Sequence, residues 1–148
     1  MPSALSKYFP PLTLDNLFRH YLPAAGAFSY VLFSAHCLNP AGLPHLFPQY
    51  WHPISMGIWF NSHLGIGIYY YHRPHLRHVT DTSRIIYTAY TTVLFNFGSI
   101  LFWGAIVDVL PRQKWIRVSF GVLTSICFLM IGREYLSYVD TLTRGEIE

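Results

Sequence analysis

The chain has 148 residues, of which 52% are hydrophobic and only 11% are Asp, Glu, Lys or Arg. Charged residues make up roughly a quarter of an average soluble domain, so they are too few here to cover a soluble surface. The formal net charge is +3, but the basic residues are scattered and form no dense stripe, which argues against nucleic acid as a partner. The composition predicts a single membrane domain over residues 1–148.

The first two apolar stretches predict membrane-spanning helices at about residues 22–38 and 54–71. The first is short for a helix that crosses a bilayer. Pro23 is tolerated there because it lies in the first turn, where its missing N–H is not needed. Between the two helices, residues 39–53 contain four prolines and no Lys or Arg, so we expect an irregular loop that rests at the membrane interface.

Two further helices are expected at about residues 85–107 and 115–131. A basic turn, residues 72–84, precedes the third helix, and a polar tail is expected from residue 132 onward. The predicted fold is therefore an all-α integral membrane protein, a bundle of four transmembrane helices.

The positions of the basic residues predict the orientation of this bundle. One side of the membrane would hold seven of them: Lys7, Arg19, Arg73, Arg77, Arg84, Arg133 and Arg144. The other side would hold three: Arg112, Lys114 and Arg117. Because basic residues accumulate on the cytoplasmic side of multi-pass membrane proteins, we expect both termini to be cytoplasmic.

Polar side chains lie near the middle of two predicted helices. Asn61 and His63 are in the second helix and Asn96 is in the third. Polar groups in hydrocarbon are costly unless they find partners, so we expect a hydrogen bond between these helices or a small polar cavity. An interhelical tie worth about 1 kcal/mol is the simpler interpretation. A His63 that contacts substrate or transfers protons is the alternative.

No Asp or Glu lies inside a predicted span, although acid–base catalysis needs a proton donor near the substrate. Asp108 follows the third helix and His36 is near the end of the first, on the same predicted side. A His36/Asp108 pair is one conceivable catalytic arrangement. A charge pair between Asp108 and Arg112 is the simpler one.

A four-residue spacing that includes two glycines recurs on one face of the second helix. Gly57, Asn61, Gly65 and Tyr69 are spaced four residues apart, a pattern that lets another helix backbone approach closely. A helix of the same chain is the simpler neighbour. A second copy of the chain, in a homo-oligomer, is the alternative.

The segment from His72 to His78, HRPHLRH, has three histidines at a spacing that resembles a metal site. Pro74 interrupts it, Arg73 and Arg77 would repel a cation, and no adjacent histidine pair of the kind used by membrane di-iron enzymes occurs in the chain. We therefore expect a hydrated loop that contacts lipid headgroups, and predict no metal and no cofactor.

Several segments together resemble the ergosterol biosynthetic protein 28 family, over about residues 20–138. The segments are Tyr21-Leu22-Pro23, Gly57-Ile58-Trp59, the run from Tyr87 to Trp103 that contains FNFGS, and Arg133-Glu134-Tyr135-Leu136. The family usually has an Arg shortly before the second-span glycine, where this chain has Ile54-Ser55-Met56. It has a His at the position of Asn96 and a Glu at that of Ile100.

The resemblance implies a non-catalytic, four-span scaffold of the endoplasmic reticulum membrane that tethers the sterol C4-demethylation enzymes. Arg73, Arg77, Arg84 and the REYL segment would form its docking surface. The three replaced ionisable groups also fit a relative recruited to another lipid or terpenoid pathway.

Two other functions remain open from the sequence. One is a membrane isomerase or cyclase for a sterol-like or terpenoid substrate. Its cavity would be lined by His63, Asn61, Asn96, Trp59, Phe95 and Trp103, whose aromatic faces could stabilise a carbocation. The other is an accessory subunit of a respiratory or other membrane complex.

Overall fold

The computed structural model describes residues 9–145, and within that range the regular elements are all helices. Lys7, which entered the orientation count, and residues 146–148 of the expected tail lie outside the described residues. Two helices, α6 (Asp81–Ile106) and α7 (Lys114–Gly145), are long and apolar enough to cross a membrane.

Helix α3 (Leu22–Leu38) covers the range expected for the first apolar helix. It is preceded without a break by α2 (Leu14–Asn16) and the π-helical turn η1 (Leu17–Tyr21), so the helical segment is longer than the apolar stretch. In the wide turn the N–H of Leu22 donates to the carbonyl oxygen of Leu17. Such widening suits the position, because Pro23 has no N–H and its ring crowds the carbonyl four residues before it.

The expected loop at residues 39–53 is more regular than its prolines suggest. It contains a short helix, α4 (Gly42–Leu46), and the first residues of α5 (Trp51–Tyr71). Pro53 is accommodated because it lies in the first turn of α5, where backbone N–H groups have no partner within the helix. Helix α5 then runs through the whole of the second predicted span.

The prediction of a polar tail from residue 132 onward is wrong for residues 132–145, which are helical. Helix α7 continues through Gly132 to Gly145. Leu136 and Asp140 are both buried there, one helical turn apart, and this part of α7 packs against η2 (Pro74–His78), a 3-10 turn. Tertiary packing on that face continues the helix, although the segment carries more polar residues than the preceding span.

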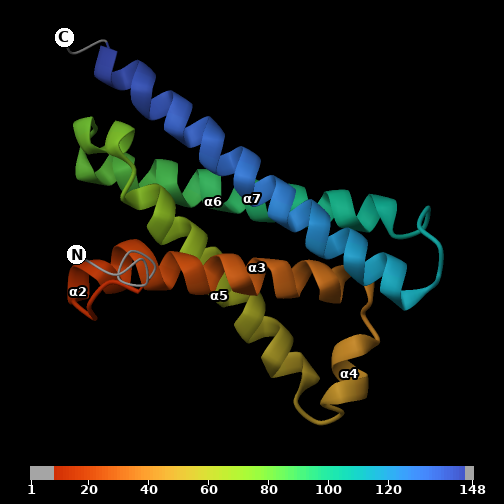
Figure 1. Cartoon of the computed structure of the whole chain (residues 1–148). Coiled ribbons are helices and arrows are strands. Elements are labelled where there is room, and N and C mark those ends of the chain that lie inside the picture. The colour runs from red at the N-terminus through yellow and green to blue at the C-terminus, as the bar shows by residue number, and fades with distance from the viewer. Residues whose placement is uncertain (1–8, 146–148) are drawn as a thin grey trace, which may run out of the picture.

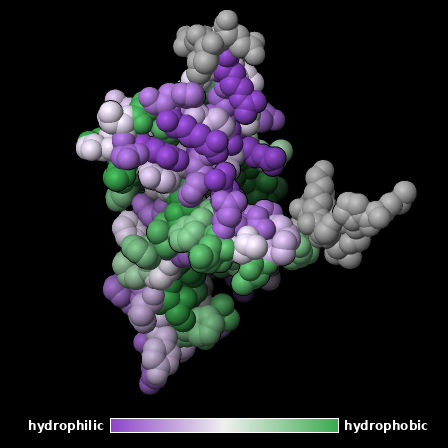
Figure 2. Space-filling model, turned by 90° about the vertical axis from the view of Figure 1, so that its left-hand side faces the viewer, coloured by the Kyte–Doolittle hydropathy of each residue, from purple (hydrophilic) through white to green (hydrophobic). Residues whose placement is uncertain are grey.

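Helix α3 occupies the centre of the molecule. It contacts α5, α6 and α7, and α5 runs obliquely across it (Figure 1). Helix α2, η2 and the C-terminal end of α7 lie at one end of the molecule, on the left in Figure 1. Figure 2 looks at that end: hydrophilic side chains gather in the upper part of the view, and hydrophobic ones form a patch below them.

The backbones of α3 and α5 touch at a pair of glycines. A Cβ built on Gly65 would lie 2.6 Å from the carbonyl oxygen of Leu22 and 2.8 Å from the backbone nitrogen of Gly26. Gly65 is thus covered by a helix of its own chain. Gly57, from the same sequence pattern, faces open space, with no atom within 4 Å of such a Cβ.

The interior is rich in small polar side chains, and the exterior in large apolar ones. Buried polar residues on the four long helices are Ser29, Ser34, Ser55, Ser62, Thr92, Asn96, Ser99, Ser125 and Asp140. Large exposed apolar residues include Phe28, Phe60, Leu101, Leu123 and Ile131. This distribution is the reverse of that in a water-soluble helical bundle.

The glycine contact generates the first prediction. Gly65→Ala places a Cβ against the α3 backbone, which cannot move aside as a flexible side chain would, so we expect the free energy of unfolding to fall by about 1–3 kcal/mol. Thermal unfolding of the detergent-solubilised protein measures this. Gly57→Ala on the same helix is the matched control and should leave the midpoint unchanged; equal losses in the two variants would contradict the proposed contact.

Candidate functional site

A buried tyrosine joins α3 to α6. Tyr30 is 1% exposed, and its hydroxyl lies 2.5 Å from Oγ of Ser99. Its ring stacks on Phe95 and packs at a tilt on Trp103, with centroids 5.2 and 5.3 Å away. Trp103 in turn donates from Nε1 to Oγ1 of Thr124 on α7, at 3.1 Å. Hydrogen bonds between side chains thus join α3 to α6 and α6 to α7.

Asn61 and Asn96, both predicted from the sequence as polar midplane residues, bond to different neighbours. Asn61 on α5 donates from its side-chain amide to Oγ of Ser29 on α3, at 2.7 Å. Asn96 on α6 accepts from the hydroxyl of Ser62 on α5, at 3.0 Å, and donates to the carbonyl oxygen of Thr92. The expected tie between the second and third helices is therefore made by Ser62.

His63 makes its contacts with other residues than the two asparagines. Its Nδ1 lies 2.9 Å from the carbonyl oxygen of Trp59, and its ring packs against Trp59 and Phe97. Nε2 is buried and has no hydrogen-bond partner in the described range 9–145. The side chain lines an open cavity of about 820 Å³ whose wall also carries Thr88.

The residues expected to form one catalytic cavity are thus distributed over the molecule. His63 lines the cavity just described, whereas Trp59 lines another of about 300 Å³ and Phe95 lines two more. Trp103 is 1% exposed and belongs to the core.

The structure does not bring His36 and Asp108 together. His36 packs near Phe33 and lines the 300 Å³ cavity, and its Nδ1 is buried without a hydrogen-bond partner in residues 9–145. Asp108 is exposed, and no ion pair joins it to His36 or Arg112 in the part of the chain that the structure describes.

Asp140 fastens the basic loop to α7. One carboxylate oxygen lies 2.6 Å from Nη2 of Arg73, and the other lies 2.6 Å from Nδ1 of His75 and accepts from the His75 backbone N–H. Arg73 also donates to the hydroxyl groups of Tyr69 and Ser137. The Asp140 side chain is only 10% exposed. We call these contacts of Asp140 with Arg73 and His75 the Asp140 clamp.

Of the two other arginines in the predicted docking surface, Arg84 is hydrogen-bonded within the protein and Arg77 is exposed to the surroundings. Arg84 donates twice to the carbonyl oxygen of Tyr71 and lies over the Tyr71 ring, 4.0 Å from its centroid. Arg77 is exposed. Within the described residues no three His, Cys, Asp or Glu side chains come close enough to hold a metal ion.

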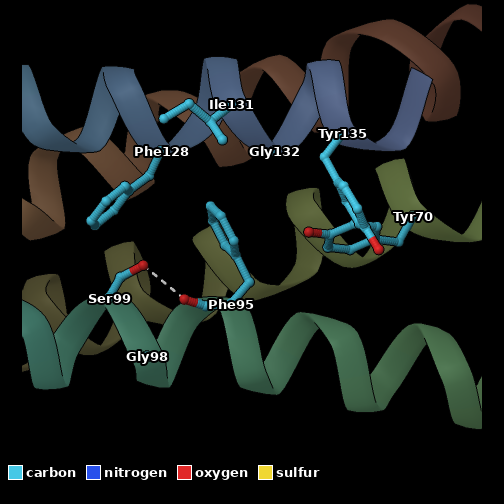
Figure 3. Close-up of a pocket in the computed structure, with 8 residues that line it drawn as sticks. All are labelled: Tyr70, Phe95, Gly98, Ser99, Phe128, Ile131, Gly132 and Tyr135. Carbon is cyan, nitrogen blue, oxygen red and sulfur yellow. Dashed lines mark hydrogen bonds between the residues drawn. The ribbon is translucent and has the colours of Figure 1, made fainter. Parts of the chain in front are cut away.

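A groove between α6 and α7 has a volume of about 370 Å³ (Figure 3). The ring of Phe95 projects from α6 toward α7, and Tyr135 projects from α7 toward Tyr70 on α5. Gly98 and Gly132, which lack side chains, leave the space open. We call this feature the α6–α7 groove.

A second, larger cavity adjoins the α6–α7 groove. It has a volume of about 680 Å³ and shares Tyr70, Phe95 and Gly132 with the groove. Its wall also carries Arg19, His20, Arg73 and Arg133. We call it the basic cavity.

Several residues of this region were not predicted from the sequence. Tyr30, Ser62 and Ser99 were missed, although a signal for one helix existed: Thr92, Asn96, Ser99 and Trp103 fall on one face of α6 at spacings of three or four residues, and all are buried. Asp140 was missed because it lies in a segment that was assigned to a tail.

No family model, no curated protein and no solved structure matches this chain.

The Asp140 clamp leads to the second prediction. Asp140→Asn removes the charge that balances the nearly buried Arg73, so the free energy of unfolding should fall by about 3 kcal/mol. The measurement is thermal or denaturant unfolding of the purified protein in detergent.

Asp108→Asn is the control for this substitution, because it removes an equal charge from an exposed position. It should change the free energy of unfolding by about 0.5 kcal/mol or less. If both variants unfold at the wild-type midpoint, the Asp140 clamp contributes no stability and the interpretation is wrong.

Proposed function

We propose that α3, α5, α6 and α7 all cross the bilayer and that the chain acts in the endoplasmic reticulum membrane as a scaffold for lipid-biosynthetic enzymes. Residues 22–72 contain no Asp, Glu, Lys or Arg, so α3 and α5 carry no charged side chain within their lengths. At about 1.5 Å per residue, the 21 residues of α5 match the thickness of the hydrocarbon core.

The reversed distribution of side chains supports this membrane arrangement. Phe28 on α3, Phe60 on α5, Leu101 on α6 and Leu123 on α7 are each more than half exposed. Exposed apolar side chains on all four helices are favourable in lipid and costly in water.

The bonding of the interior polar groups is the observation that favours a scaffold over an enzyme. Asn61 and Asn96 are bonded to Ser29 and Ser62, and Tyr30 is bonded to Ser99. Side chains engaged in this way tie helices together and are not free to act on a substrate.

The end of the molecule near η2 supplies a surface for partners. The Asp140 clamp holds η2 against α7, while Arg77, Arg133 and Arg144 are exposed around it. A fixed basic surface suits acidic patches on membrane enzymes. Together with the resemblance to the ergosterol biosynthetic protein 28 family, it leads us to propose the sterol C4-demethylation enzymes as partners, on the cytoplasmic side.

The membrane arrangement gives the third prediction. With Cys37 and Cys127 replaced by Ala, His78→Cys and Gln113→Cys should react with a membrane-impermeant maleimide from opposite sides of sealed microsomes, because three helices separate the N-terminus from residue 113 and two separate it from residue 78. Position 78 should react from the cytoplasmic side. Labelling of both positions from one side would contradict the four-span arrangement.

The scaffold role gives the fourth prediction. Deleting the gene should cause 4-methyl sterols to accumulate, and purification in mild detergent should recover sterol C4-demethylation enzymes. Combining Arg77→Ala with Arg144→Ala should reduce that recovery, whereas Arg112→Ala, at the other end of the molecule, should not.

Two results would replace the scaffold proposal. An unchanged sterol profile without recovered sterol enzymes would exclude this partner class. Turnover of a sterol-like or terpenoid substrate by the purified protein alone, abolished by His63→Ala in a folded variant, would make the chain an enzyme.

A further inference from the structure

The basic cavity has the size and charge of a site for an anionic ligand. Its volume of about 680 Å³ is within the range of pockets that hold small molecules. Three arginines and a histidine line it, and no Asp or Glu is among its lining residues. The remaining wall is largely apolar and includes Ile66 and Leu129.

The arginines of the basic cavity are not equally neutralised. Arg19 pairs with Asp15 at 2.6 Å, and Arg73 pairs with Asp140. Arg133 is exposed and makes no ion pair with any residue in the described range 9–145. Arg73 has a further unused donor, since its Nε is buried without a hydrogen-bond partner there. Because Arg133 is unpaired within that range, the cavity keeps a net positive charge.

The neighbouring α6–α7 groove is apolar and of a different character. Phe128, Ile131 and Tyr135 line it with the residues that it shares with the basic cavity (Figure 3). Ile131 and Tyr135 are each more than 60% exposed, so the groove is open on the side of the molecule that carries exposed apolar residues. An apolar chain can enter it from surrounding lipid.

We propose that the basic cavity and the α6–α7 groove together bind an acidic membrane phospholipid. Its phosphate lies among Arg73, Arg133 and Arg19, and one acyl chain lies along the groove. The assignment rests on the proposed membrane-spanning arrangement, because the lipid enters laterally from the bilayer. Guanidinium groups form strong charge-assisted hydrogen bonds with phosphate oxygens, so the cavity prefers an acidic phospholipid to a zwitterionic one.

Two substitutions test the two parts of the site, each with a matched control on the same helix. Arg133→Gln removes the unpaired charge of the cavity, and Arg144→Gln removes an exposed charge of α7 that does not line it. Gly98→Leu places a side chain in the α6–α7 groove, where an added Cβ has no atom within 4 Å. Gly104→Leu adds the same side chain to open space on α6, away from the groove.

The experiment is native mass spectrometry of the purified full chain in non-ionic detergent, titrated with palmitoyl-oleoyl phosphatidic acid or with phosphatidylcholine of the same chains. Phosphatidic acid should bind about tenfold more tightly. Arg133→Gln should remove most of that preference and Arg144→Gln none of it. Gly98→Leu should weaken binding of both lipids, and Gly104→Leu should not.

Equal affinities for the two lipids, or equal effects of Arg133→Gln and Arg144→Gln, would overturn the proposal. Oleate and farnesyl diphosphate are titrated in the same way. If either binds more tightly than phosphatidic acid, the ligand is a free anionic amphiphile and not a bilayer phospholipid. Size-exclusion chromatography checks each variant for folding. If Gly98→Leu does not fold, the two arginine variants still decide.

The lipid titration and the tests of the proposed function can fail independently of each other. Cysteine labelling that contradicts four spans would remove the membrane arrangement, whatever the lipid titration gives. Correct labelling and sterol-enzyme recovery together with equal lipid affinities would overturn the lipid site and leave the scaffold proposal intact.

Discussion

The close approach of α3 to its neighbours is the constraint on which the rest of the structure depends. At Gly26 and Gly65 the backbones of α3 and α5 meet with no side chain between them, and Gly121 of α7 lies against the carbonyl oxygen of Ser34. In the proposed bilayer arrangement the hydrophobic effect would not drive the helices together, so close van der Waals contact and hydrogen bonds would have to do so. Fixing α5 on α3 at Gly65 also turns Asn61 toward Ser29 and leaves Ser62 on the face that meets Asn96.

The polar interior follows from the same constraint. Small hydroxyl side chains such as Ser34, Ser62 and Ser125 are almost fully buried because they fit between close backbones. Ser34 and Ser125 satisfy their hydroxyl groups on carbonyl oxygens of their own helices, whereas Ser62 reaches across to Asn96. The polar residues that looked like candidates for chemistry therefore have a structural explanation, and His63 and His36 stand apart because each keeps a buried ring nitrogen without a partner in residues 9–145.

Local signals in the sequence predicted α3 well and the C-terminal half of α7 poorly. An uncharged apolar run after Tyr21, with Pro23 in its first turn, is enough to define α3. The last helix was predicted to end at about residue 131. The contacts that continue it could not be predicted, because they join residues distant in sequence: Asp140 bonds to Arg73 and His75. The two cavities were unpredictable for the same reason, since each is built from at least three helices. The spacing of Thr92, Asn96, Ser99 and Trp103 places them on one face of α6, so the burial of all four could have been predicted from the sequence.

Arg73 connects the exposed basic end to the interior. Its guanidinium group is bonded to Asp140, which holds η2 on α7, and the same side chain forms part of the wall of the basic cavity. Because Asp140 neutralises Arg73, the net charge of the cavity depends on Arg133, one helical turn before Ser137 and two before Asp140 on α7. A partner or lipid that bonds to Arg133 thus acts on the helix that carries the Asp140 clamp. Helix α7 therefore carries both the Asp140 side of the clamp that holds η2 and the arginine of the cavity wall that makes no ion pair within residues 9–145.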